Sequence, residues 1–145
     1  MEGSITHVDD VDDLGVHGEH LRPLLTHAMG SPIEVVDHRG EVGAGPPPHH
    51  HPWHEIFVVV AGELDVSIGD QEVRRLGPGS LAHVPPGTTH SFRYVDPHTH
   101  VIGITSEGRA SDLFRAASRA TPEQLPGVGP LFGLQRDPTP HPHTR

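Results

Sequence analysis

The stretch from residue 43 to residue 62, GAGPPPHHHPWHEIFVVVAG, restricts the fold and chemistry of this chain more than any other. Three prolines lead into three histidines, a glutamate follows four residues after the last of them, and an apolar run ends at a glycine. Because proline removes the backbone donors that helices and central strands need, the approach to the histidines is predicted to be extended. Alternate side chains share a face of an extended chain, so His49 and His51 are expected to point one way and His50 the other.

These side chains form an incomplete metal site. Glu55 begins the next predicted strand, beyond a kink at Pro52 and Trp53, and can turn its carboxylate back toward His49 and His51. Two imidazoles and one carboxylate leave a metal ion one protein ligand short. The sequence therefore predicts that another part of the chain supplies the missing ligand.

The rest of the chain has the pattern of short strands. Polar and apolar residues alternate from Leu64 to Ile68, and turns are indicated at Gly69-Asp70 and at Gly77-Pro78-Gly79. The other expected strands lie at residues 33–36, 56–60, 71–76, 81–84, 90–94 and 99–105. Short strands at regular spacing indicate an all-β sandwich or barrel.

One helix is predicted near the C-terminus. Ser111 is a suitable N-cap, and Leu113, Phe114 and Ala117 form an apolar stripe, so we expect a helix packed across the outside of the barrel.

The two ends of the chain differ from its middle. Residues 1–19 carry four aspartates with few apolar neighbours and are expected to form a flexible acidic arm. Residues 121–145 are rich in proline and are expected to form a poorly ordered or draped tail. One domain is therefore expected over residues 20–120.

His90 is the predicted third histidine ligand. Residues 79–90 read GSLAHVPPGTTH, in which a strand is followed by a Pro-Pro-Gly turn and then a histidine. The turn reverses the chain, so His90 should open a new strand, which a barrel would place beside the first histidine strand.

Taken together, the two histidine segments resemble the motifs of the cupin superfamily. The first motif, G-x5-H-x-H-x3-E-x6-G, and the second, G-x5-P-x-G-x2-H-x3-N, match this chain at Gly43, His49, His51, Glu55, Gly62, Gly79, Pro85, Gly87 and His90. The closing asparagine is replaced by Tyr94. The resemblance implies a single jelly-roll β-barrel of two packed antiparallel sheets, with a metal in its mouth held by His49, His51, Glu55 and His90.

An alternative fourth ligand remains open. His54 precedes Glu55, and the kink before it allows either side chain to face the metal. If His54 binds, the site has four histidines and Glu55 lies outside the ligand set as a carboxylate or base. The register to Gly62 favours Glu55. His50 and His83 should face away from the pocket.

The metal and the partners follow from the ligand types and the charge. Imidazoles suit zinc, iron, copper and nickel, and a carboxylate extends this range toward manganese; we expect one divalent metal, with zinc first and iron, nickel or copper as alternatives. The formal charge of −9 argues against nucleic acid. No membrane-spanning stretch or signal pattern is seen, so a cytoplasmic protein is expected. The resemblance implies a homodimer.

A narrower resemblance concerns function. The Gly-Pro-Pro-Pro-His lead-in, the HSF after the second motif and the SEGRASDLFR helix are similar to small-molecule cupins, namely quercetinase-like dioxygenases and the cyclases of tetracenomycin- and resistomycin-type polyketide pathways. Size and lysine-free, acidic composition are most similar to the cyclases. This implies an antibiotic-biosynthesis enzyme that closes rings in a poly-β-ketone by aldol condensation, through a metal-stabilised enolate.

Residues with roles in that reaction can be named. Metal-bound water, Glu55 or His54 would act as base. The expected pocket walls are Trp53, Phe57, Phe92, Tyr94 and Ile102. A metal-dependent dioxygenase is the first alternative, and a non-catalytic binding cupin is the second.

Overall fold

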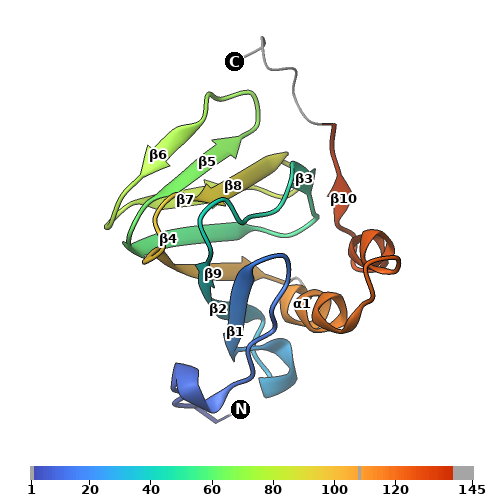
Figure 1. The fold of residues 1–145 in the computed structure, drawn as a ribbon. Helices are drawn as coiled ribbons and strands as arrows, with labels where there is room; N and C mark the ends of the chain where they lie inside the picture. The colour runs from blue at the N-terminus through green and yellow to red at the C-terminus, as the bar shows by residue number, and fades with distance from the viewer. Residues whose placement is uncertain (1, 108, 139–145) are drawn as a thin grey trace.

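The computed structural model describes residues 2–107 and 109–138, which form two antiparallel sheets (Figure 1). In the first sheet the order is β1 (Glu19–Leu25), β2 (Ile33–Gly40), β9 (His100–Ser106), β4 (Glu55–Ala61) and β7 (Leu81–Val84). In the second the order is β10 (Gln135–Arg136), β3 (His49–His50), β8 (His90–Tyr94), β5 (Leu64–Ile68) and β6 (Arg74–Leu76). This confirms the predicted all-β fold of two antiparallel sheets.

The hydrophobic core lies between the sheets. It combines side chains from β4, β7 and β9 with side chains from β5 and β8: Phe57, Val59, Leu64, Val66, Ala82, Val84, Phe92, Tyr94 and Val101. Each strand contributes alternate residues, because successive side chains point to opposite faces. The burial of both inner faces holds the sheets together and fixes which residues face inward.

The predicted helix is α1 (Ala110–Arg119), and it begins earlier than expected. Ser111 lies inside the helix and is not its N-cap: its N–H donates to Glu34 Oε1 at 3.0 Å and its hydroxyl to Glu34 Oε2 at 2.5 Å. The buried carboxylate of Glu34, on β2, therefore takes the capping role at the positive end of the helix. This anchors α1 beside β1 and β2 (Figure 1).

The segment before β1 is in contact with the fold. It contains a short 3-10 helix, η1 (Val8–Asp10), and continues to Leu14, which is buried against Leu21 and Val36. The N–H of Leu14 donates to the carbonyl of Leu21 at 2.8 Å. The acidic residues stay exposed, but this apolar side chain docks the end of the arm onto the first sheet.

The segment after α1 runs along the side of the barrel. It forms η3 (Leu125–Gly127), α2 (Val128–Leu131) and β10, which pairs with β3 (Figure 1). Phe132 and Leu134 pack against the apolar cluster of Trp53, Ala110 and Leu113. Of the two arrangements expected for the tail, the structure shows a draped one up to residue 138; residues 139–145 lie outside the described part.

A chain that ends at Ala120 is expected to keep its barrel. β10 adds only two residues at a sheet edge, whereas the loss of Phe132 and Leu134 removes apolar contacts with the Trp53, Ala110 and Leu113 cluster and should cost about 2 kcal/mol of unfolding free energy. Circular dichroism, thermal melting and metal content would measure this. A truncated chain that does not fold or does not bind metal would show that the tail belongs to the domain.

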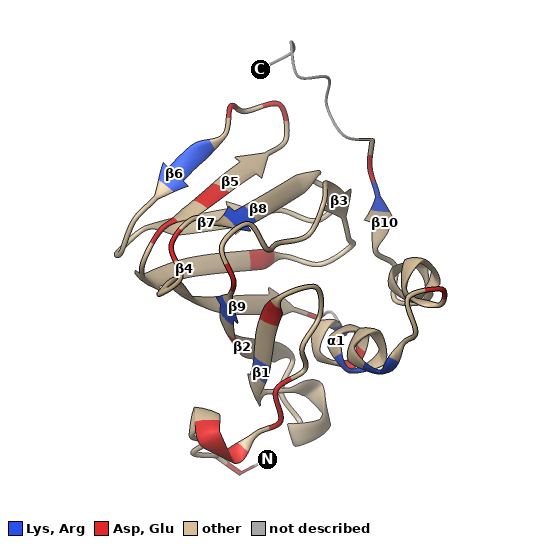
Figure 2. Cartoon of the chain, viewed as in Figure 1, with Lys and Arg blue, Asp and Glu red and all other residues tan. Residues whose placement is uncertain are grey.

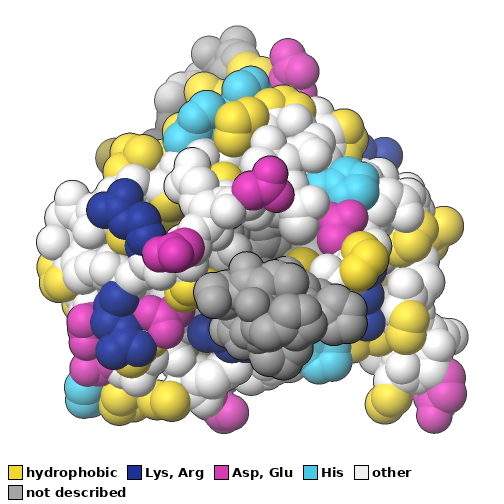
Figure 3. All heavy atoms as spheres, turned by 90° about the horizontal axis from the view of Figure 1, so that it is seen from above, with side chains coloured by type: hydrophobic (Ala, Val, Ile, Leu, Met, Phe, Trp, Pro, Cys, Tyr) yellow, Lys and Arg dark blue, Asp and Glu magenta, His cyan; other side chains and the backbone are white. Residues whose placement is uncertain are grey.

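The surface charge is predominantly acidic. Acidic residues lie on η1, in loops and on β1, β4 and β5, and arginines lie on β6, β8 and β10 (Figure 2). On the face shown in Figure 3 the arginines are scattered, some of them beside acidic residues, and do not form a continuous basic area. Within the described residues, no helix has the length and apolar character needed to cross a membrane.

Candidate metal centre

Segments from both sheets bring the predicted ligands together. His49 on β3 and His90 at the start of β8 are direct cross-strand partners, with ring centroids 4.1 Å apart. His51 follows β3, and Glu55 opens β4 in the other sheet. All four side chains are buried, and one donor atom from each lies within 4.8 Å of the others.

Backbone carbonyls fix the tautomer of each imidazole. Nδ1 of His49 lies 2.9 Å from Pro47 O, Nδ1 of His51 lies 3.1 Å from Trp53 O, and Nδ1 of His90 lies 2.9 Å from Thr88 O. A carbonyl oxygen only accepts, so each Nδ1 must carry the proton and donate it. Each Nε2 then presents a lone pair, as a metal ligand requires.

The arrangement of acceptors fits a cation. Glu55 Oε1 lies 3.0 Å from Nε2 of His90 and 3.3 Å from Nε2 of His51. A carboxylate oxygen facing two imidazole lone pairs is unfavourable unless a proton or a metal ion lies among them. Donors bound to one metal at about 2.1 Å are separated by roughly 3.0–3.4 Å, so the spacing of Glu55 Oε1 from these two nitrogens suits a divalent ion.

Burial and mutual contacts shift the pKa values of these groups. Burial lowers the pKa of His49 to about 4, with the neighbouring His90 adding to the effect. Burial pushes the pKa of Glu55 up, but hydrogen bonds with His51 and His90 outweigh it and hold the pKa well below its ordinary value. Burial opposes protonation of His90, yet Glu55 raises its pKa above the ordinary value.

The turn before His90 is joined to the first histidine strand. Gly87 has a φ of 76°, a conformation that favours glycine, and its N–H donates to the carbonyl of His51 at 2.9 Å. The Pro-Pro-Gly turn therefore places His90 by a bond to the segment that carries the other ligands.

The structure separates Glu55 from its alternative, His54. The side chain of His54 is exposed, and its Nδ1 lies 3.0 Å from Nε2 of His83 on the outer face of the sheet. Adjacent residues of a strand point to opposite faces, so Glu55 turns inward and His54 outward. His50 also faces away, toward Asp137 at 2.9 Å.

Replacing these two neighbours should give different results. Glu55→Gln is expected to weaken metal affinity at least tenfold, which is the low end of the 10–100-fold cost of losing outer-sphere partners. His54→Ala should change the affinity less than about twofold, since an exposed side chain on the outer face has no access to the donors. Isothermal titration with zinc would measure both. The reverse order would place His54 in the ligand set.

A mostly apolar cavity of about 140 Å³ adjoins the metal donors. Its wall includes His49 and Glu55 beside apolar side chains from β1 and the segment before it, from β8, from α1 and from the tail: Val16, Leu21, Phe92, Leu113, Phe114, Ala117 and Leu134. An apolar cavity of about 150 Å³ holds one benzene ring, so this space suits a ring-sized part of a ligand. The helix α1 thus forms part of the cavity wall in addition to covering the barrel.

The five residues predicted as pocket walls lie in different parts of the structure. Phe92 lines the cavity, and Trp53 stacks on His51 with ring centroids 4.4 Å apart. Phe57 and Tyr94 lie in the core between the sheets. Ile102 is not among the cavity residues, because it shares the outward face of β9 with His100 and Ile104.

Other cavity residues were not anticipated from the sequence. Glu19 and His38 add polar groups to the wall, and Leu113, Phe114 and Leu134 close it from the helix and the tail. Alternate residues of β2 share a face, so His38 lies on the same inward face as Glu34 and Val36. This alternation was the only sequence feature that could have identified His38 as a cavity residue.

The fold and the site define a small double-sheet β-barrel with a buried three-histidine, one-carboxylate group suited to a divalent metal. Residues 38–101 match the family model described as the cupin domain. The described barrel therefore has the fold of a cupin, and its central part matches the cupin pattern that the two histidine motifs implied.

Comparisons with known proteins agree with this assignment. Over 82 residues the chain is 33% identical to quercetin 2,3-dioxygenase of Bacillus subtilis (strain 168), covering 56% of this chain and 24% of that protein. The chain spans about a quarter of the curated relatives it matches. These relatives are therefore longer proteins that share the domain.

Two solved structures share the fold over most of their length. KdgF from Halomonas sp. superposes with a TM-score of 0.68 and 27% identity, covering 77% of this chain and 99% of that one. The polyketide cyclase RemF from Streptomyces resistomycificus superposes with a TM-score of 0.62 and 21% identity, covering 73% and 79%. Because the sequence identity with RemF is so low, this similarity shows a shared fold and nothing further.

Proposed function

We propose that the protein is a metal-dependent enzyme that closes a ring in a poly-β-ketone by aldol condensation and loss of water. The observation that carries this proposal is the junction of a buried His-His-Glu-His donor set with an apolar cavity the size of one ring. A divalent metal held there, with zinc our first choice, would supply a Lewis acid that polarises a carbonyl group and makes the adjacent C–H more acidic.

The side chains of this chain have separate tasks in that reaction. Phe92, Leu113 and Phe114 bind the carbon chain and exclude water from the reacting atoms. Of the two bases expected from the sequence, Glu55 lines the cavity and the exposed His54 does not. We therefore assign the proton transfer at the substrate to Glu55 and not to His54.

A quercetinase-like dioxygenase is the second candidate. The 33% identity with the Bacillus subtilis quercetin dioxygenase favours it, and the same donor set would suit iron, nickel or copper. The two candidates differ in their need for molecular oxygen, since ring closure by condensation neither consumes nor releases electrons.

The deciding experiment is turnover of the zinc-loaded protein without oxygen. Supplied with a poly-β-ketone precursor, it should form a cyclised, dehydrated product, whereas metal-free protein should form none. Oxygen uptake with quercetin is measured in parallel. A strict requirement for oxygen, with its incorporation into product, would replace the cyclase by the dioxygenase.

A further inference from the structure

His38, on β2, is a buried histidine of the cavity wall that the metal site does not use. Its side chain is 4% exposed, and Nδ1 has no hydrogen-bond partner among the described residues. The nearest carboxylate oxygen, Oε1 of Glu19, is 3.8 Å away, beyond hydrogen-bond length. A buried nitrogen without a partner costs folding free energy, so its presence beside a cavity needs a reason.

The fold holds this ring by shape. Phe57 and Phe114 pack edge-on against it, with ring centroids 6.4 Å and 5.9 Å away. A Cβ at residue 103 would lie 2.5 Å from Nε2 of His38, so Gly103 on β9 leaves the room that the imidazole occupies. The ring is thus placed firmly, while its Nδ1 has no hydrogen-bond partner among the described residues.

A second polar pair adjoins His38. The hydroxyl of Tyr94 donates to Oε1 of Glu19 at 2.9 Å, and Glu19 also lines the cavity. Burial, together with the charge of Glu19, raises the pKa of Tyr94 far above its ordinary value, so the phenol remains a donor. Tyr94 therefore fixes the carboxylate next to the imidazole.

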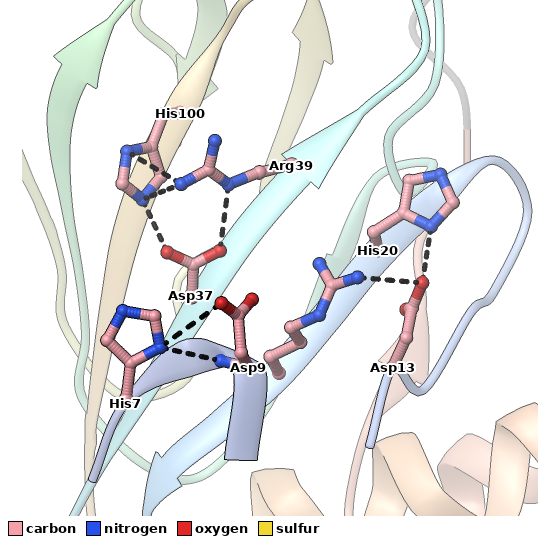
Figure 4. Close-up of polar contacts among 8 residues, drawn as sticks. His7, Asp9, Asp13, His20, Asp37, Arg39 and His100 are labelled. Carbon is pink, nitrogen blue, oxygen red and sulfur yellow. Dashed lines mark hydrogen bonds and ion pairs between the residues drawn. The ribbon is translucent and has the colours of Figure 1, made fainter. Parts of the chain in front are cut away.

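Two histidines outside the cavity, His20 and His100, differ from His38 in their polar contacts. His20 lies 2.7 Å from Asp13, and His100 lies 2.5 Å from Asp37 on the opposite face of β2 (Figure 4). Both have a carboxylate within hydrogen-bond length. His38 lacks such a partner in the described structure, although Glu19 stands close by.

The strand register places His38 away from the metal donors. Val101 of β9 pairs with His38 on one side and with Val59 of β4 on the other. His38 is therefore level with Val59, four residues along β4 from Glu55. The cavity thus has one polar end at the donors and another at His38, with apolar walls between them.

We propose that His38 binds the substrate by a hydrogen bond to an oxygen atom, at a point of the cavity separate from the metal donors, with Phe57 and Phe114 holding its ring in place. The ligand is then a ring-sized, largely apolar molecule with two oxygen substituents on separate carbons, one directed to the metal site and one to His38. The proposal rests on the proposed function only in taking this cavity as the substrate site.

The test compares two ring-sized probes, resorcinol with two hydroxyl groups and phenol with one, binding to the metal-loaded protein in a calorimeter. Wild-type protein should prefer resorcinol. His38→Leu, of similar volume, should weaken resorcinol binding about five- to tenfold and phenol binding less than twofold. His38→Gln, which keeps a hydrogen-bonding group, should retain most of the preference. His83→Leu, on the outer face, should change neither.

Thermal stability separates substrate binding from a structural role. Because Leu removes a buried unpartnered nitrogen, His38→Leu should melt at the wild-type temperature or above it. A His38→Leu protein that melts lower and binds both probes as wild type does would make His38 structural. Wild-type protein that binds resorcinol no more tightly than phenol would also overturn the proposal. Neither readout involves turnover, so failure of the cyclase assay remains a separate result.

Discussion

Alanine at His49, His51 or His90 is expected to abolish stoichiometric metal binding. Each imidazole is held by a carbonyl so that its Nε2 faces the same point as the carboxylate of Glu55. Loss of one donor should reduce affinity by more than the roughly 100-fold that losing an outer partner costs. Elemental analysis after dialysis would measure it, with His83→Ala as the matched outer-face control. Full metal content in any single ligand variant would remove that residue from the site.

The same variants should lose the stabilisation that metal gives to the folded chain. An ion that binds only the folded state at about 1,000 times its dissociation constant adds roughly 4 kcal/mol to the unfolding free energy. We therefore expect zinc to raise the melting temperature of the wild type and of His83→Ala, and to leave that of the ligand variants unchanged. An equal rise in all of them would indicate binding elsewhere.

Metal-free protein is expected to lose stability as the pH falls from about 6.5 to about 4, because of His49. Burial lowers the pKa of this imidazole from 6.5 to about 4 in the folded state. Between these values the unfolded chain binds the proton and the folded chain does not, so stability rises with pH and is lost on acidification. A shift of this size corresponds to about 3 kcal/mol.

The other two groups with shifted pKa values, Glu55 and His90, affect stability in different pH ranges. Glu55, with its lowered pKa, contributes stability above its unfolded pKa, which is lost only at more acid pH. His90, with its raised pKa, contributes stability below 6.5 that is lost as the pH rises through its folded value. Urea unfolding of wild type and His49→Gln across pH 4–7 isolates His49. If the unfolding free energies of the two proteins changed in the same way with pH, the assignment of this pH dependence to His49 would be wrong.

The side chains that the sequence predicted as metal ligands lie close together in the structure, because each part of that prediction depends on local geometry. Period-two alternation put His49 and His51 on one face, and the register to Gly62 favoured Glu55 over His54. The Pro-Pro-Gly turn placed His90 at the start of a strand, and the structure pairs that residue with His49. Motif spacing, the alternation of side chains along a strand and the type of a turn each depend on only a few neighbouring residues, so they can be recognised in the sequence.

What only the tertiary structure decided depends on strand order and closure. Ser111 is capped by Glu34, 77 positions away in the chain, and not by its own side chain. His38 and Glu19 reach the cavity because β1 and β2 extend the sheet beyond β9, and Leu134 reaches it because the tail returns past β3. No short-range pattern encodes such contacts, since they form when distant segments pack around one core. Local periodicity thus indicated the candidate ligands, while the closure of the barrel determined what surrounds them.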